Sequence, residues 1–159
     1  MDYLIKQVTD VMHVLIEIDS ELTEISIESY HRLAYLSLIE TIVSDIRSAI
    51  VSRENIPDEV YKTLFVKIGA LAMGILRKEY HFNSTRFAQF LLNKHKLYGP
   101  GPFEHWGHIS AIVRLDSKIE RLKNIFKNPE LDDHGESSVD TLNDIIGYCV
   151  LGYYLKGVN

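Results

Sequence analysis

The stretch "ESSVDTLNDIIGYCVLGYYL", residues 136–155, predicts a mostly apolar, buried helix that nevertheless has three carboxylates on one face. Glu136, Asp140 and Asp144 recur at intervals of four. Each step of four advances an α-helix by only about 40°, so the three side chains form one narrow acidic stripe. Like charges at this spacing destabilise a helix. We therefore expect a cation opposite the acidic stripe, supplied by a basic helix, a metal ion or both.

Length and composition indicate one soluble domain. The chain has 159 residues, of which 46% are hydrophobic and 25% charged, which suits a single hydrophobic core. A net charge of −5 disfavours general binding to nucleic acid or to an anionic membrane. No segment approaches the roughly 20 apolar residues of a membrane span. The single cysteine, Cys149, cannot form a disulfide framework, so we expect a cytoplasmic protein.

Apolar residues recur at helical spacing along nearly the whole chain. This periodicity predicts helices within residues 4–15, 36–50, 57–79, 85–96, 108–126 and 136–155. The alternating glycines and prolines of "YGPGPF", residues 98–103, interrupt regular structure and form the one firm internal boundary. No strand-like alternation is found. We predict a single all-α domain over residues 1–159, a bundle of about six helices, with a helical pair that holds the site in residues 98–159.

The helix predicted over residues 108–126 supplies a basic stripe. Arg114, Lys118 and Arg121 fall within about 60° of one another, beside the apolar face of that helix. If this helix packs antiparallel to the helix of residues 136–155, the basic and acidic stripes line one cleft. Such a cleft favours a magnesium-bound polyphosphate.

Structural explanations for the acidic stripe stand beside this one. Ser137-x-x-Asp140 matches a capping box, and acids in a first helical turn are favoured by the helix dipole. Asp144 lies two turns into the helix, beyond the reach of that effect. Its alternative role is an interhelical ion pair with Lys118 or Arg121.

Three segments resemble a known family. They are "NKHKLYG" (residues 93–99), "IVRLDSKIERLKNIF" (residues 112–126) and "ESSVDTLNDIIGY" (residues 136–148). In this order they resemble the nucleotide-modification-associated domain family of phage-type genomes, over residues 94–154. The pattern is more distantly similar to the MazG-like all-α nucleoside triphosphate pyrophosphohydrolases. In those enzymes, carboxylates on neighbouring helices hold magnesium over the triphosphate, and water attacks between the α and β phosphates.

The resemblance implies a role for each stripe. Carried over by position, the residues of the acidic stripe become catalytic metal ligands for Mg²⁺, with Mn²⁺ as an alternative, and those of the basic stripe hold phosphates. Lys96, Tyr98 and Tyr148 complete the implied nucleotide site, although both tyrosines can equally pack in a bundle core. The Glu-x-x-Glu pair of the MazG pattern is replaced here by Asp116 and Glu120, which lie on the other face of their helix.

The sequence therefore predicts a Mg²⁺-dependent nucleotide pyrophosphohydrolase that converts a nucleoside triphosphate to the monophosphate and pyrophosphate. Bound metal would polarise phosphoryl oxygens and orient the attacking hydroxide. One alternative is a helical module that binds a nucleotide without turnover. Another is a structural protein whose stripes form ion pairs. We also expect a homo-oligomer, in the host cytoplasm if the gene is phage-encoded.

Overall fold

The residues described by this computed structural model, 3–25 and 30–155, form seven α-helices and two short 3₁₀ helices, with no strand among them. None of the helices in these ranges combines the length and the apolar character that a membrane span requires. The elements are α1 (Val8–Glu24), α2 (Arg32–Val51), α3 (Asp58–Glu79), α4 (Ser84–Tyr98), α5 (Gly101–Trp106), α6 (His108–Lys127), η1 (Pro129–Leu131), η2 (Asp133–Gly135) and α7 (Glu136–Tyr154).

The prediction of an all-α bundle of about six helices is confirmed. The additional helix is α5, which begins inside the segment of residues 98–103 that was expected to lack regular structure. The chain does break at Gly99, whose φ of 75° lies in a region that favours glycine. The expectation is wrong for residues 101–103, because a proline is well tolerated in the first turn of a helix.

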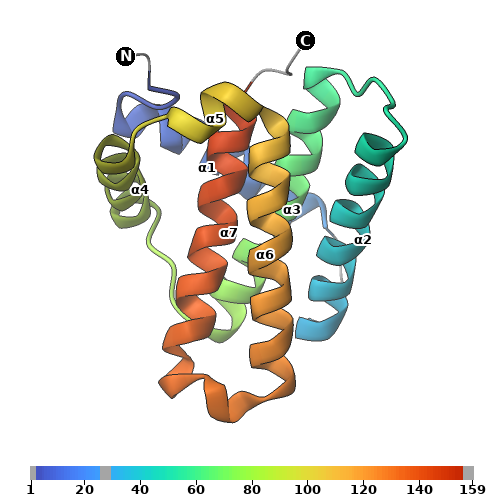
Figure 1. Ribbon diagram of the computed structural model, residues 1–159. Helices are drawn as coiled ribbons and strands as arrows, with labels where there is room; N and C mark the ends of the chain where they lie inside the picture. The colour runs from blue at the N-terminus through green and yellow to red at the C-terminus, as the bar shows by residue number, and fades with distance from the viewer. Residues whose placement is uncertain (1–2, 26–29, 156–159) are drawn as a thin grey trace.

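Helices α6 and α7 form an antiparallel hairpin, joined at one end by η1 and η2 (Figure 1). α3 packs along α7, and α2 packs on both α3 and α6. α1 packs on α3 and on α4. Consequently α4 reaches the bundle on the opposite side of α7 from α2 (Figure 1).

The core is centred on α3, in which every residue from 68 to 76 is buried. A helix that is apolar all round must be enclosed, and α1, α2 and α7 enclose this one. Contact between α3 and α7 depends on a glycine. A Cβ atom at Gly152 would lie 2.8 Å from two ring atoms of Phe65, which is itself 1% exposed. The helices can therefore approach this closely only where a side chain is missing.

Ion pairs connect the outer face of α6 to α2. Arg47 Nη1 lies 2.8 Å from Asp116 Oδ1, and Lys123 Nζ lies 3.3 Å from Glu40 Oε2. Lys123 Nζ also lies 3.7 Å from Glu120 Oε1. The two carboxylates that replace the Glu-x-x-Glu pair therefore occupy the face of α6 that turns toward α2.

The first turn of α7 is capped differently from the sequence-based interpretation. Gly135, with a φ of 82°, precedes the helix, and Ser137 already lies inside it, so the capping box of Ser137 and Asp140 is wrong. Asp132 instead accepts a hydrogen bond of 3.1 Å from the backbone N–H of Ser138 and a second hydrogen bond from the hydroxyl of Ser138. A side chain before the 3₁₀ turn thus satisfies a donor that the helix leaves free.

Candidate functional site

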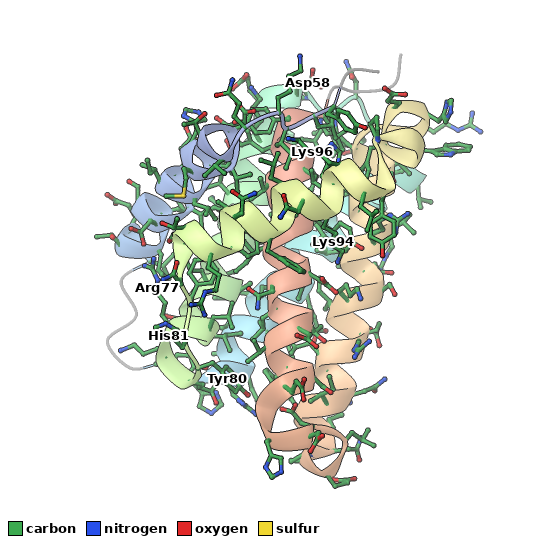
Figure 2. The ribbon with its side chains drawn as sticks, turned by 90° about the vertical axis from the view of Figure 1, so that its left-hand side faces the viewer. Asp58, Arg77, Tyr80, His81, Lys94 and Lys96 are labelled. Atoms are coloured by element: carbon green, nitrogen blue, oxygen red, sulfur yellow. The ribbon has the colours of Figure 1, made fainter. Side chains whose placement is uncertain are left out.

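α4 forms one wall of a groove whose other walls are α6 and α7. Asn83 caps α4, since its side chain accepts a hydrogen bond of 2.9 Å from the backbone N–H of Arg86. Figures 1 and 2 show that α4 crosses α7 at a steep angle, so it covers only part of the hairpin. The residues of α4 that are buried are Phe87, Ala88, Leu91, Leu92 and His95.

Each wall of the groove is one helical stripe, because residues three or four apart in a helix lie on the same side. The stripes are Phe90, Lys94 and Tyr98 on α4, Asp140, Asp144, Gly147 and Leu151 on α7, and Arg114 and Arg121 on α6. The acidic stripe thus continues into small and apolar residues where it meets α4. Gly147 allows the two helices to come close, since a Cβ there would lie 3.2 Å from Leu91 Cδ1.

The groove consists of two adjoining hollows. The aromatic hollow has a volume of about 400 Å³, and Tyr98, Phe103 and Tyr148 are among the rings that line it. The polar hollow has a volume of about 610 Å³, and its polar lining includes Arg86, Arg121 and Asp140. Both volumes are in the range of small-molecule sites. The residues common to both hollows are Phe87, Phe90, Lys94, Asn143 and Asp144.

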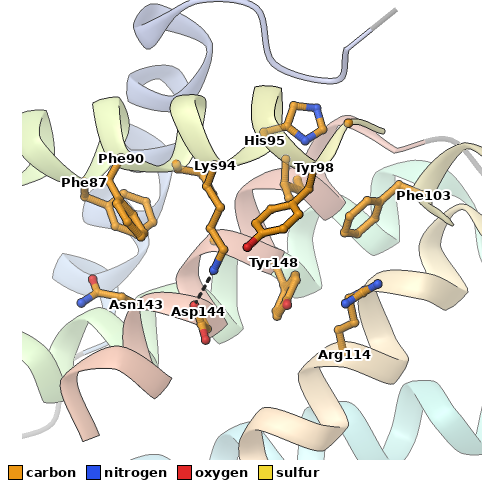
Figure 3. Close-up of a pocket in the computed structure, with 14 residues that line it drawn as sticks. Phe87, Phe90, Lys94, His95, Tyr98, Phe103, Arg114, Asn143, Asp144 and Tyr148 are labelled. Carbon is orange, nitrogen blue, oxygen red and sulfur yellow. Dashed lines mark hydrogen bonds and ion pairs between the residues drawn. The ribbon is translucent and has the colours of Figure 1, made fainter. Parts of the chain in front are cut away.

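Asp144 is held by two lysines where the hollows join. Lys118 Nζ lies 2.9 Å from Asp144 Oδ2, and Lys94 Nζ lies 3.2 Å from Asp144 Oδ1. Figure 3 shows Lys94 extending from α4 toward Asp144 on α7. The side chains are 25%, 39% and 22% exposed for Lys118, Lys94 and Asp144, so all three still reach solvent. Two cations share one carboxylate, which leaves this cluster with a net positive charge.

Arg114 adds a further cation at the aromatic hollow. Its guanidinium carbon lies 5.6 Å from the centre of the Phe103 ring and 5.8 Å from that of Tyr148, within the range of cation–π attraction. Figure 3 shows its side chain rising from α6 toward these two rings. In the described part of the chain, neither Arg114 nor Arg121 forms an ion pair with a carboxylate. Their charges are therefore available to an anionic ligand.

His95 closes the aromatic hollow on the side of the N-terminal segment. Its Nε2 accepts a hydrogen bond of 3.2 Å from the backbone N–H of Leu4, and Tyr3 meets its ring edge-on. Burial lowers the pKa of His95 from its ordinary value. The ring is therefore neutral at pH 7 and ties α4 to the segment that precedes α1.

The acidic stripe is spread along α7 rather than gathered at one point. Glu136 is exposed at the start of the helix and lines neither hollow, whereas Asp140 lines the polar hollow and Asp144 lines both. Within residues 3–25 and 30–155, no group of three or more His, Cys, Asp or Glu side chains is placed to hold a metal ion. Mg²⁺ and Mn²⁺ at this stripe stay predictions.

The groove brings together most of the residues expected to bind a nucleotide. Tyr98, Tyr148 and Arg114 line the aromatic hollow, and Arg121 lines the polar hollow. Lys118 contacts Asp144, which lines both hollows. Lys96 differs, because it is exposed and lines neither hollow; Figure 2 shows it on the opposite side of α4 from Lys94.

Apart from Tyr98, sequence reasoning missed the contribution of α4 to this groove. Lys94, Phe87, Phe90 and Arg86 were not assigned any role, although they provide one wall and two of its cations. The available signal was the spacing of Phe90, Lys94 and Tyr98 at i, i+4 and i+8, which places an amphipathic stripe beside the buried face of α4.

Comparison of the chain with protein-family models gave no match, and neither did comparison with curated proteins or with solved structures. The family resemblance of residues 94–154 stays a prediction.

Proposed function

We propose that this protein binds a nucleotide in the groove between α4 and the α6–α7 hairpin, with the base in the aromatic hollow and the phosphates on the surrounding cations. The observation that favours this function most is the position of Arg114. It is unpaired among the described residues, lies beside the rings of Phe103 and Tyr148, and faces a hollow of about 400 Å³.

The charges around the groove suit phosphate oxygens. A guanidinium can donate two parallel hydrogen bonds to a phosphate, and such charge-assisted bonds are stronger than neutral ones. Arg114 stands at one end of the groove, and Arg86 and Arg121 line the other. Lys94 and Lys118 lie between them with a single carboxylate. Phosphates in the groove would thus have cations near them at either end and at the junction of the hollows.

The aromatic hollow suits a flat ring. Aromatic side chains such as Phe87, Phe90 and Tyr148 bury large apolar areas and stack on planar groups. Asn143, at the junction of the hollows, offers an amide donor and acceptor that can bind the edge of a base or sugar. An apolar pocket with a few polar groups at its rim is the usual form of a small-molecule site.

Hydrolysis is the second candidate, and the lining of the polar hollow favours it. Asp140, Asn143 and Asp144 all line this hollow and are oxygen ligands of the type that Mg²⁺ prefers. Mg²⁺ often takes only one or two protein carboxylates, and the phosphates of the substrate and water supply the rest. A metal brought by the nucleotide would then orient water for attack on the α-phosphorus, with pyrophosphate leaving. We place binding first because Asp144 already has two lysine partners.

Calorimetric titration with nucleoside mono- and triphosphates in EDTA tests the binding function. We expect wild type to bind at least one of them, and Arg114→Gln to bind it about tenfold more weakly or worse, since a charge-assisted hydrogen bond is lost. Lys67→Gln is the matched control, because Lys67 is exposed and lines neither hollow. Equal affinity of wild type and Arg114→Gln would remove Arg114 from the site.

The same nucleotides with Mg²⁺ separate binding from hydrolysis. Release of pyrophosphate that disappears in Asp140→Asn would favour the pyrophosphohydrolase. Binding without product would favour the module that does not turn its ligand over. If no nucleotide binds under either condition, the proposed function fails and the structural alternative is favoured.

A further inference from the structure

We propose that Asp144 is an internal competitor of the ligand: its carboxylate occupies the position between Lys94 and Lys118 that a ligand phosphate takes, and binding displaces it. This inference concerns the regulation of the groove and rests on the proposed function. It gives Asp144 a role that neither a metal ligand nor a purely structural ion pair would have.

The geometry of the carboxylate supports this role. Each of its oxygens contacts a different lysine. Oδ2 lies 2.9 Å from Lys118 Nζ on α6, and Oδ1 lies 3.2 Å from Lys94 Nζ on α4. A phosphate bound between the same two ammonium groups would use two of its oxygens in the same way. Asp144 thus presents to the lysines the kind of group that the ligand brings.

The location of this contact makes Asp144 a competitor of any ligand that occupies both hollows. Lys94 and Asp144 line both hollows, and their ion pair joins α4 to α7 where the two hollows meet (Figure 3). A ligand with its ring in the aromatic hollow and its phosphates near Arg121 must pass this point. It would have to separate Lys94 from Asp144 or remain in one hollow.

The partial exposure of the three side chains makes the exchange feasible. Lys94 is 39% exposed and Asp144 22% exposed, so the released carboxylate can turn to water without being buried unpaired. The lysines gain a phosphate when they lose the carboxylate. Asp144 therefore lowers the affinity of the groove for every anion that binds between Lys94 and Lys118, and it keeps those lysines paired while the groove is empty.

The competing hypotheses predict opposite signs for one substitution. If Asp144 competes with the ligand, then Asp144→Asn strengthens phosphate binding, because the lysines no longer have to release a carboxylate. If Asp144 holds a metal for the phosphates, the same substitution weakens binding in Mg²⁺. If the pair is only structural, it leaves the affinity unchanged. Glu136→Gln is the matched control, since it removes the same charge from the same helix but lies outside both hollows.

Titration with inorganic pyrophosphate in EDTA tests the inference without assuming any base. We expect Asp144→Asn and Asp144→Ala to bind pyrophosphate about tenfold more tightly than wild type, equal to about 1.4 kcal/mol, and Glu136→Gln to match wild type. The affinity of the Asp144 variants should also fall more steeply with added salt, since two unpaired cations then attract the anion. Detectable binding only in the Asp144 variants would support the inference equally.

The inference is overturned if both Asp144 variants bind pyrophosphate no more tightly than wild type, or if Glu136→Gln gains as much as they do. Its failure is distinct from failure of the proposed function. Nucleotide binding by wild type, with no gain in the Asp144 variants, would remove only the inference. A gain for pyrophosphate without nucleotide binding by wild type would remove only the proposed nucleotide ligand.

Discussion

Lys118 Nζ lies 2.9 Å from Asp144 Oδ2, so the middle of the basic stripe on α6 meets the last carboxylate of the acidic stripe on α7. The interhelical ion pair considered for Asp144 is thus present. Its second partner, Lys94, comes from a helix fifty residues earlier in the chain. One charge therefore connects three helices.

The first prediction concerns the stability of Asp144→Asn. Breaking a buried ion pair costs about 3–5 kcal/mol, but exposed pairs are worth about 1 kcal/mol or less. Since Lys94, Lys118 and Asp144 all reach solvent, we expect the variant to lose about 1 kcal/mol, which lowers the melting temperature by about 3 °C. Thermal melts in EDTA measure this change.

Excess Mg²⁺ provides the control for that experiment. Without nucleotide we expect Mg²⁺ to leave both melting temperatures unchanged, because no three-carboxylate group is assembled in the described residues. A ligand that binds the folded state at a hundredfold over its dissociation constant would stabilise it by about 2.7 kcal/mol. Such a shift in wild type, absent from the variant, would instead establish Asp144 as a metal ligand.

The second prediction compares two lysines of α4. Lys94 points into the groove and Lys96 lies on the opposite side of the helix (Figure 2), although both belong to the segment for which the sequence predicts a resemblance to the nucleotide-modification-associated domain family. Lys94→Gln should change the affinity for the bound nucleotide, because it removes a cation that a phosphate would contact. Lys96→Gln should not. Equal effects of the two substitutions would exclude the placement of the ligand proposed here, and calorimetric titration in low salt measures both.

The helices were predictable because their evidence is local. Apolar residues at helical spacing, as in residues 36–50 and 57–79, indicate which face of a helix is buried without reference to the rest of the chain. Helix ends were less predictable. Both Ser137 and Asp132 can cap a helix, and only the structure shows that α7 follows Gly135 and that Asp132 reaches its first turn.

The candidate site was predictable only in part, for the same reason. The basic stripe of Arg114, Lys118 and Arg121 and the acidic stripe around Asp144 follow from spacing within single helices. The wall that α4 supplies does not, since it depends on the steep crossing of α4 over α7 (Figures 1 and 2). No pattern along the sequence shows that Lys94 will meet Asp144.

The third prediction concerns pH. Burial lowers the pKa of His95 in the folded protein, while the unfolded chain keeps an ordinary value of about 6.5. The unfolded state therefore binds a proton at a pH where the folded state does not. The stability from neutral His95 is present above pH 6.5 and is lost as the pH falls through the lower pKa of the folded state. His108, whose pKa is also lowered mainly by burial, acts in the same direction.

Urea unfolding between pH 7.5 and pH 5 measures this loss. His95→Gln keeps an acceptor for the N–H of Leu4 but cannot be protonated, so its stability should fall less over this range than that of wild type. His105→Gln is the control, because it makes the same substitution at an exposed histidine. Identical pH profiles for wild type and His95→Gln would show that His95 is not the group responsible.

The last prediction tests the close contact between α3 and α7 at Gly152. Gly152→Ala places a Cβ atom 2.8 Å from the Phe65 ring, in a core where both residues are buried. Overpacking of this kind costs about 1–3 kcal/mol, and the better helix propensity of alanine returns at most about 1 kcal/mol. We therefore expect a net loss of stability in urea unfolding.

Gly101→Ala is the matched control, since nothing lies within 4 Å of its added Cβ, and it should unfold like wild type. If Gly152→Ala is as stable as Gly101→Ala, the Phe65 ring has room to move, and α3 and α7 are not held together as closely as their spacing at Gly152 indicates.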